Sequence, residues 1–234
     1  MDPPANESAL LERARACAGL TLGELATQLQ IAVPVDLRRA KGWVGGLFEM
    51  ALGATAKSRA APDFEALGVE LKTLPVTLGG QPLETTFVCT IPLARMGEVE
   101  WEQSRVRKKL RRVLWVPVEG TRTTPVGVRR IGTALLWSPT PEEERDLRFD
   151  WEELAGMIGG GRVEDITGHL GRYLQVRPKA RDSHARRLGT GSDGARISTL
   201  PRGFYLRTTF TARILSRHFA LPVAPPPRRS ENAI

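Results

Sequence analysis

The chain has 234 residues and a net charge of +8, with 34 lysines and arginines against 26 acidic residues. This length is enough to bury a sizeable core, and it favours one domain or two closely packed lobes. Two cysteines exclude a disulfide framework, and no apolar run approaches the roughly 18 residues of a membrane helix, so we expect a cytoplasmic protein with no membrane contact. The positive charge favours a polyanionic partner but does not separate DNA from RNA or an anionic surface.

Helical signals come first along the chain. Thr21 and Glu24 form a capping box ahead of apolar residues at helical spacing, which predicts a helix that begins there. Another helix is expected before it, over residues 8–18. Residues 43–52 predict a third helix with one broad apolar face, and Glu49 lies off that face.

From residue 69 the apolar period changes to two, because Val69 and Leu71 alternate with Glu70 and Lys72. This alternation predicts a strand with one buried face. Further strands, rich in β-branched and aromatic residues, are expected at residues 85–91, 112–118, 131–137, 173–176 and 204–206. Later helices are expected ahead of the strand at 112–118 and at residues 140–158 and 209–219.

These elements predict an α/β fold in which a mixed β-sheet is flanked by helices. Residues 181–196 are rich in Arg, Gly, Ser and Asp and predict an exposed, mobile loop. We expect residues 1–220 to form a single domain and residues 221–234, which begin with a proline and arginine run, to be a disordered tail.

Asp63, followed by Glu70 and Lys72, has the spacing of an acid, a spacer and then acid-x-lysine on a strand. Residues two apart on a strand point the same way, so Glu70 and Lys72 are expected side by side. Two carboxylates suit a hard cation such as Mg²⁺, and a lysine can orient an attacking water. The same alternation also occurs on the solvated faces of strands, and Glu49 is either a further metal ligand or a solvated glutamate.

Basic residues are densest between residues 105 and 112, where six lysines and arginines predict either phosphate contacts or a solvated helical face. Arg177 with Lys179, and Tyr205 with Arg207, combine basic and aromatic groups that can contact DNA bases. The sequence has no Walker P-loop and no Gly-x-Ser-x-Gly elbow, so an ATP-driven motor is not expected.

Many collinear segments between residues 7 and 219 make the chain resemble the MutH family of strand-nicking endonucleases. The segments are residues 41–43, 48–49, 63–64, 67–73, 83–88, 112–115, 135–139, 175–179 and 200–206. The resemblance implies a restriction-endonuclease-like fold of two lobes around a DNA cleft. It also implies a Mg²⁺-dependent nick in the unmethylated strand of double-stranded DNA at hemimethylated GATC, in methyl-directed DNA mismatch repair.

The resemblance further implies roles for particular residues. The metal-binding acids fall on Glu49, Asp63 and Glu70, and the catalytic lysine on Lys72. Positions close to the DNA fall on Lys41, Phe87, Lys109, Arg177, Lys179 and Tyr205. Among these, Tyr205 is the candidate sensor of adenine methylation, and a MutL-type ATPase is the expected activator.

Two other functions stay open at this point. A GATC-specific type II restriction endonuclease would share the same centre and would cut both strands. The single copy of the catalytic signature favours nicking by a monomer. A DNA-binding protein that has lost catalysis is disfavoured because Asp63, Glu70 and Lys72 are all present.

Overall fold

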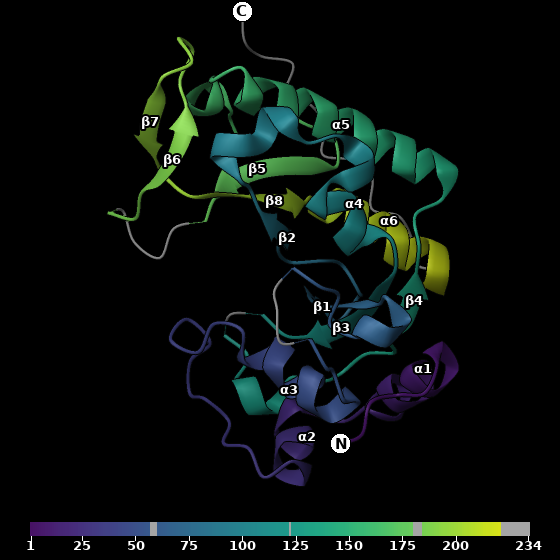
Figure 1. Ribbon diagram of the computed structural model, residues 1–234. Helices are drawn as coiled ribbons and strands as arrows, with labels where there is room; N and C mark the ends of the chain where they lie inside the picture. Colours follow the sequence, from purple (N-terminus) through teal and green to yellow (C-terminus); the bar gives the residue numbers. More distant parts are fainter. Residues whose placement is uncertain (57–59, 122, 180–183, 221–234) are drawn as a thin grey trace, which may run out of the picture.

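Three small β-sheets, flanked by helices, carry the strands of the computed structural model (Figure 1). The structure describes residues 1–56, 60–121, 123–179 and 184–220. The helices are α1 (Glu7–Ala16), α2 (Leu22–Gln28), α3 (Trp43–Leu52), α4 (Arg105–Leu110), α5 (Pro141–Gly159) and α6 (Thr208–Phe219). The strands are β1 (Glu70–Val76), β2 (Thr86–Thr90), β3 (Val113–Glu119), β4 (Leu135–Trp137), β5 (Leu174–Pro178), β6 (Arg187–Thr190), β7 (Arg196–Thr199) and β8 (Arg202–Leu206).

The mixed α/β character is confirmed, but the strands do not form one sheet. The first sheet, in the order β1-β3-β4, is mixed, because β1 runs parallel to β3 and β4 runs antiparallel to it. The second sheet, β2-β8-β5, is antiparallel throughout. The second sheet is assembled from strands far apart in the sequence, so local patterns could not have predicted its order.

Capping explains where two of the helices begin. Both predicted capping boxes are present, since Thr21 with Glu24 and Thr140 with Glu143 each satisfy the free amides at the start of α2 and α5. At the other end of α3, Gly53 has a φ of +76° and a Cβ there would lie 2.6 Å from the carbonyl oxygen of Asp2. Only glycine fits this helix end.

The prediction of an exposed, mobile loop over residues 181–196 missed strands in its described part, although most of those residues are exposed. Strands β6 and β7 pair as an antiparallel hairpin, the third sheet. The base of this hairpin is held by Glu164, which accepts hydrogen bonds from the Thr199 hydroxyl and from the buried Arg202 guanidinium. These polar anchors act together with Ile197, which packs against the hydrophobic core, to order the segment. The tail expected over 221–234 lies outside the described residues.

Buried side chains form two hydrophobic clusters, and β3 contributes to both. Val113 and Trp115 belong to the cluster that packs around α5, α6 and the second sheet. Leu114, Val116 and Val118 point the other way, into the cluster that includes α1, α2 and α3. β3 is therefore buried on both faces, as its unbroken apolar sequence requires. Within the described ranges, no helix is both long and apolar enough to cross a bilayer.

Candidate active site

A buried carboxylate between two ammonium groups lies at the start of β1. Glu70 is only 3% exposed. Lys72 Nζ lies 2.5 Å from its Oε1, and Lys109 Nζ lies 2.7 Å from its Oε2. The face of β1 that carries Glu70 is therefore buried and not solvated. The two ammonium groups supply the partners that a buried carboxylate requires. Glu70 and Lys72 lie side by side as predicted, while Leu71 packs into the core.

Asp63 approaches the same centre from the turn before β1. Its Oδ2 accepts a hydrogen bond of 2.8 Å from the amide of Leu71, between Glu70 and Lys72. Burial and the neighbouring charge of Glu70 raise the pKa of Asp63 to about 6, although the Leu71 hydrogen bond and two lysines act in the opposite direction. The spacing in the sequence thus brings two acids together in three dimensions, and the charge of Glu70 disfavours ionisation of Asp63.

Lys109 is a member of this centre and not of a surface patch. It lies on α4, is 6% exposed, and also donates a hydrogen bond of 2.6 Å to the carbonyl oxygen of Ala61. Its ammonium therefore ties the segment that leads to Asp63 to the carboxylate of Glu70. This role was not predicted from the residue pattern, because Lys109 is one of six basic residues between positions 105 and 112. A signal was present, because Val106, Lys109 and Leu110 share the inward face of α4 at helical spacing.

Oxygen ligands for a hard cation are available at this centre. Asp63 and Glu70 supply carboxylates, which is the donor type that Mg²⁺ prefers. Glu49 lies on an exposed part of α3, near the end where the amide of Ala54 bonds to its carbonyl oxygen. The described residues contain no group of three or more His, Cys, Asp or Glu side chains arranged to hold a metal. The geometry thus brings together two of the three predicted acids.

A second group of predicted residues gathers on one face of the β2-β8-β5 sheet. The rings of Phe87 and Tyr205 make an edge contact with centroids 5.3 Å apart. The Lys179 ammonium lies 4.3 Å from the centre of the Phe87 ring, which gives a cation–π contact. Arg177 is exposed, and its guanidinium donates to the hydroxyl of Thr85 at 3.1 Å. Thr85 thus orients Arg177, a role that the sequence did not suggest.

Lys41 and Arg207 lie apart from these two groups. Lys41 is exposed on the segment just before α3. Arg207 precedes α6, and its guanidinium donates to the carbonyl oxygens of Gly168, Leu170 and Gly171. These bonds hold the turn before β5, so the geometry gives Arg207 a structural role, and contact between Arg207 and DNA remains only a prediction.

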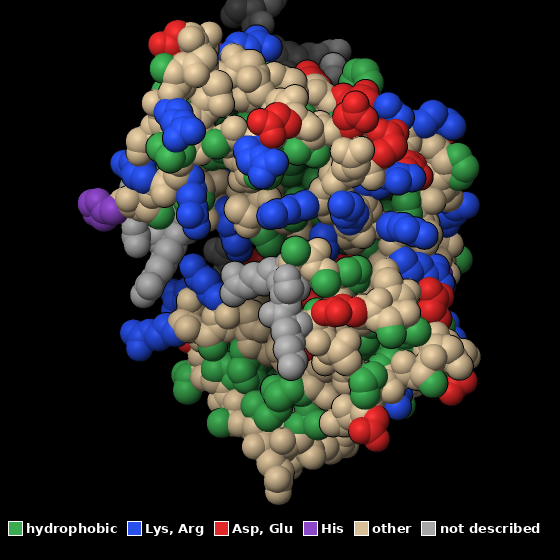
Figure 2. All heavy atoms as spheres, in the orientation of Figure 1, with side chains coloured by type: hydrophobic (Ala, Val, Ile, Leu, Met, Phe, Trp, Pro, Cys, Tyr) green, Lys and Arg blue, Asp and Glu red, His purple; other side chains and the backbone are tan. Residues whose placement is uncertain are grey.

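The basic run between residues 105 and 112 is divided among different environments. Arg107 forms an ion pair with Glu144 on α5, and Arg112 pairs with Glu7 on α1. Both cations therefore join helices instead of facing solvent alone. Figure 2 nevertheless shows Lys and Arg side chains gathered in a band across the middle of the face in view. The net positive charge is thus partly structural and partly available to an anionic partner.

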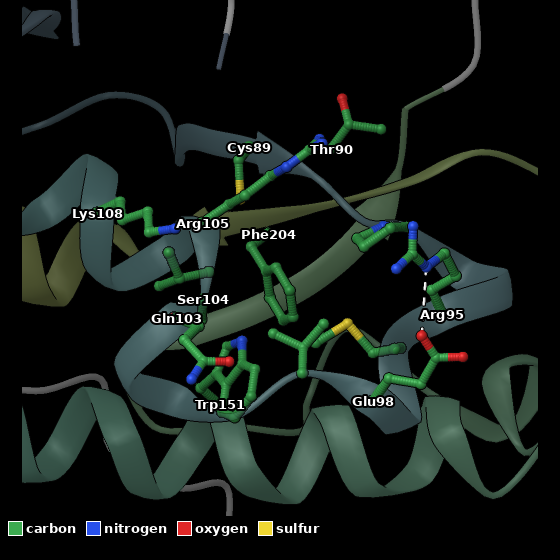
Figure 3. Close-up of a pocket in the computed structure, with 14 residues that line it drawn as sticks. Cys89, Thr90, Arg95, Glu98, Gln103, Ser104, Arg105, Lys108, Trp151 and Phe204 are labelled. Carbon is green, nitrogen blue, oxygen red and sulfur yellow. Dashed lines mark hydrogen bonds and ion pairs between the residues drawn. The ribbon is translucent and has the colours of Figure 1, made fainter. Parts of the chain in front are cut away.

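Arg105 and Lys108 line a pocket of about 350 Å³ on the other side of the second sheet. Figure 3 shows these side chains with Cys89, Phe204 and Trp151 around the hollow. Phe204 lines this pocket, whereas the next residue of β8 stands on the opposite face of the sheet. Asp63, Glu70 and Lys72 do not line the pocket, but Cys89, which does, lies close enough to Lys72, Lys109 and Glu70 for their charges to act on its thiol.

Comparison with known proteins assigns the family. A family model described as "DNA mismatch repair enzyme MutH" matches residues 52–150, which include Asp63, Glu70 and the whole of α4. The chain is 57% identical over 221 residues to the DNA mismatch repair protein MutH of Salmonella paratyphi C, covering 94% of this chain and 96% of that one. The relative from Salmonella choleraesuis matches equally well, and that from Salmonella newport is 56% identical over the same length. The chain therefore belongs to the MutH family of DNA mismatch repair enzymes.

Proposed function

We propose that this enzyme is a Mg²⁺-dependent endonuclease that nicks the unmethylated strand of double-stranded DNA at hemimethylated GATC sites. The observation that carries the proposal is the buried Glu70, held between Lys72 and Lys109 and next to Asp63. Burying several charged groups together costs desolvation free energy. Such clusters are therefore concentrated at functional sites. Family membership supports the role in mismatch repair.

Asp63 and Glu70 would hold the metal, with Glu49 as a candidate third ligand. The residues fit a divalent cation because two adjacent carboxylates repel one another, as the raised pKa of Asp63 reflects. When bound, Mg²⁺ supplies positive charge that stabilises the scissile phosphate. A cation held by Glu70 would compete with the ammonium groups of Lys72 and Lys109 for the carboxylate oxygens.

Lys72 is the candidate catalytic lysine. Its side chain contacts Glu70 and is 13% exposed, against 8% for Lys109. In this position it orients the attacking water and offsets the carboxylate charge as the phosphate approaches. Lys109 has a different part, because its side chain is more deeply buried and also holds Ala61.

The DNA is proposed to contact the sheet face that carries Phe87, Tyr205, Arg177 and Lys179, with Lys41 on the far side of the duplex. The two hydrophobic clusters would then form lobes on either side of a DNA cleft, within a single domain over residues 1–220. Arginine suits guanine in the major groove, where it can form two hydrogen bonds to one base. Tyr205 would stand against the adenine of the site.

Duplexes that carry one GATC site test the proposal. The unmethylated, hemimethylated and fully methylated forms are incubated with Mg²⁺, and each strand carries its own label. We expect cleavage of unmethylated strands only, with none in the presence of a chelator. A duplex with one altered base in the site is the matched control. Concerted cutting of both strands would instead favour the restriction-enzyme alternative.

A MutL-type ATPase is proposed as the activator. A monomer whose cleft opens and closes is activated when a partner favours the closed, metal-competent arrangement. Purified MutL with ATP should therefore raise the nicking rate on GATC DNA. If the isolated protein already cleaves at its maximal rate and the partner changes nothing, activation by MutL is wrong.

A further inference from the structure

The register of the second sheet places one glycine at the centre of the proposed DNA-contacting face. Gly203 and Tyr205 are two apart on β8 and so share this face. On the β5 side, Gly203 pairs with Arg177, and Tyr205 pairs with Gln175. On the β2 side, Tyr205 pairs with Phe87. Gly203 is thus surrounded by the side chains to which DNA contact is assigned.

The space over Gly203 is occupied by two aromatic rings. A Cβ built on this glycine would lie 2.9 Å from Cε2 of Phe87 and 3.3 Å from Cε2 of Tyr205. The carbonyl oxygen of Cys89 would lie 3.2 Å away. Gly203 does not have a positive φ, so its backbone would accept an L residue. Glycine is therefore required by the two rings and not by the backbone conformation at this position.

We propose that Gly203 is a positioning residue that sets where the rings of Phe87 and Tyr205 stand, and thereby how the enzyme distinguishes methylated from unmethylated adenine. The inference rests on the proposed function, because it assumes that these rings meet the GATC site. It adds a residue that touches no DNA in this role, since both rings cover it. Selectivity then depends on a missing side chain as well as on the rings themselves.

The surroundings determine which way the rings would move if the glycine were filled. Gln175, the neighbour of Tyr205 on β5, is only 4% exposed and closes the space beside Tyr205 on that side. The Lys179 ammonium covers Phe87 at 4.3 Å. Between Phe87 and Cys89 the pairing of β2 with β8 is irregular, and such bulges commonly set the direction of a side chain near a functional site. A Cβ at residue 203 would project from β8 into the space of both rings, so we expect it to displace them away from the β8 backbone, the side on which the base is proposed to lie.

A displacement of a few tenths of an ångström is sufficient to matter. Discrimination between adenine and its N6-methyl form depends on the space of one methyl group, which is read by exclusion. Rings moved towards the base exclude the methylated strand more strongly and also weaken binding of the unmethylated site. The ring contacts of Phe87 and Tyr205 are with each other and with Lys179, not with Asp63 or Glu70, so the chemical step at saturating DNA should change little.

Gly203→Ala tests this inference in the full-length protein. On unmethylated GATC duplex we expect KM to rise about tenfold while kcat stays within about twofold. On hemimethylated duplex the ratio of nicking rates between the two strands should increase. Gly156→Ala on α5 is the matched control, because a Cβ there meets nothing within 4 Å, and it should leave KM and the ratio unchanged. Melting temperatures show whether either variant is folded.

A double-mutant cycle separates positioning from general crowding of the backbone. Phe87 holds the atom nearest to the added Cβ, so Gly203→Ala should cost much less in a Phe87→Leu background than in the wild type. An equal rise in KM in both backgrounds would assign the effect to the carbonyl oxygen of Cys89. Wild-type KM and selectivity in Gly203→Ala would show that Gly203 does not position the rings. Either result overturns the inference. If the wild-type enzyme nicks methylated and unmethylated strands at the same rate, the proposed function is wrong, and this result is obtained before any variant is made.

Discussion

Lys109 Nζ lies 2.7 Å from Oε2 of Glu70, so a lysine of α4 and the first residue of β1 form one buried ion pair. This pair is 39 residues apart in the sequence and joins the helix to the strand at the acidic centre. With Lys72 on the other oxygen, it leaves the carboxylate neutralised from both sides.

Removing the Lys109 ammonium should destabilise the metal-free protein. We expect Lys109→Met to lower the free energy of unfolding by about 3 kcal/mol, the lower end for a broken buried pair, because Lys72 still partners Glu70. Added Mg²⁺ should restore part of this loss by neutralising the same carboxylate. Thermal unfolding with and without Mg²⁺ measures both effects. The exposed neighbour Lys108→Met is the control and should change neither.

Loss of either acid should remove catalysis without removing DNA binding. We expect Asp63→Ala and Glu70→Ala to abolish nicking while DNA affinity stays within about tenfold, because the acids act on the transition state and their removal relieves repulsion from phosphate. Glu65→Ala, an exposed acid two residues from Asp63, should nick normally. Near wild-type nicking by either catalytic variant would remove these acids from the metal site.

The raised pKa of Asp63 predicts a pH dependence of stability with a defined sign. In the metal-free fold the pKa is about 6 against an ordinary value of 3.8, so the folded protein holds this proton more tightly than the unfolded chain does. The stability from Asp63 is therefore full below 3.8 and is lost as the pH rises through about 6.

Asp63→Asn removes this titration, so the difference in unfolding free energy between wild type and variant should change across that pH interval and be flat above it. Denaturant unfolding in a chelator at several pH values measures the difference. A constant difference from pH 4 to pH 7 would contradict the raised pKa. Mg²⁺ competes with the same proton, so nicking at low Mg²⁺ should also decline as the pH falls below about 6.

Tyr205 should determine selectivity through the bulk of its ring. Tyr205→Ser should narrow the difference in nicking rate between methylated and unmethylated strands while retaining metal-dependent cleavage, because the acidic centre is untouched. Tyr205→Phe keeps the ring and should retain most of the difference, since exclusion of a methyl group does not need the hydroxyl. The two strands of one hemimethylated duplex provide the measurement. Equal discrimination by the serine variant would assign the reading to Arg177 or Lys179.

The sequence predicted the local features whose physical cause is local. The alternation around Glu70 and Lys72 gave β1, and capping boxes gave the starts of two helices, because both signals depend on neighbours within a few residues. The placement of Asp63 next to this strand also followed from its spacing. The DNA-contacting residues of the second sheet were predicted only from the resemblance to the MutH family, because no sequence spacing connects them.

Features that depend on distant partners could not be predicted. The pairing of β2 with β8 joins residues more than a hundred positions apart, so neither the sheet order nor the space above Gly203 is visible in the chain. The burial of Lys109 depends on Glu70 and Ala61, and in the sequence it is one of six basic residues in a run. The β6–β7 hairpin depends on polar anchors at Glu164.

β3 sends alternate side chains into the two hydrophobic clusters and pairs in parallel with β1, so it is the shared wall of both. A strand packed on both faces cannot slide without opening both cores, so we expect any movement of one cluster relative to the other to be a rotation about β3. Glu70 at the start of β1 pairs in register with Val113 of β3, so it should move little in such a rotation. The proposed DNA-contacting face could then rotate while Glu70 stays nearly in place. Backbone amides of β3 should be the last to exchange with deuterium.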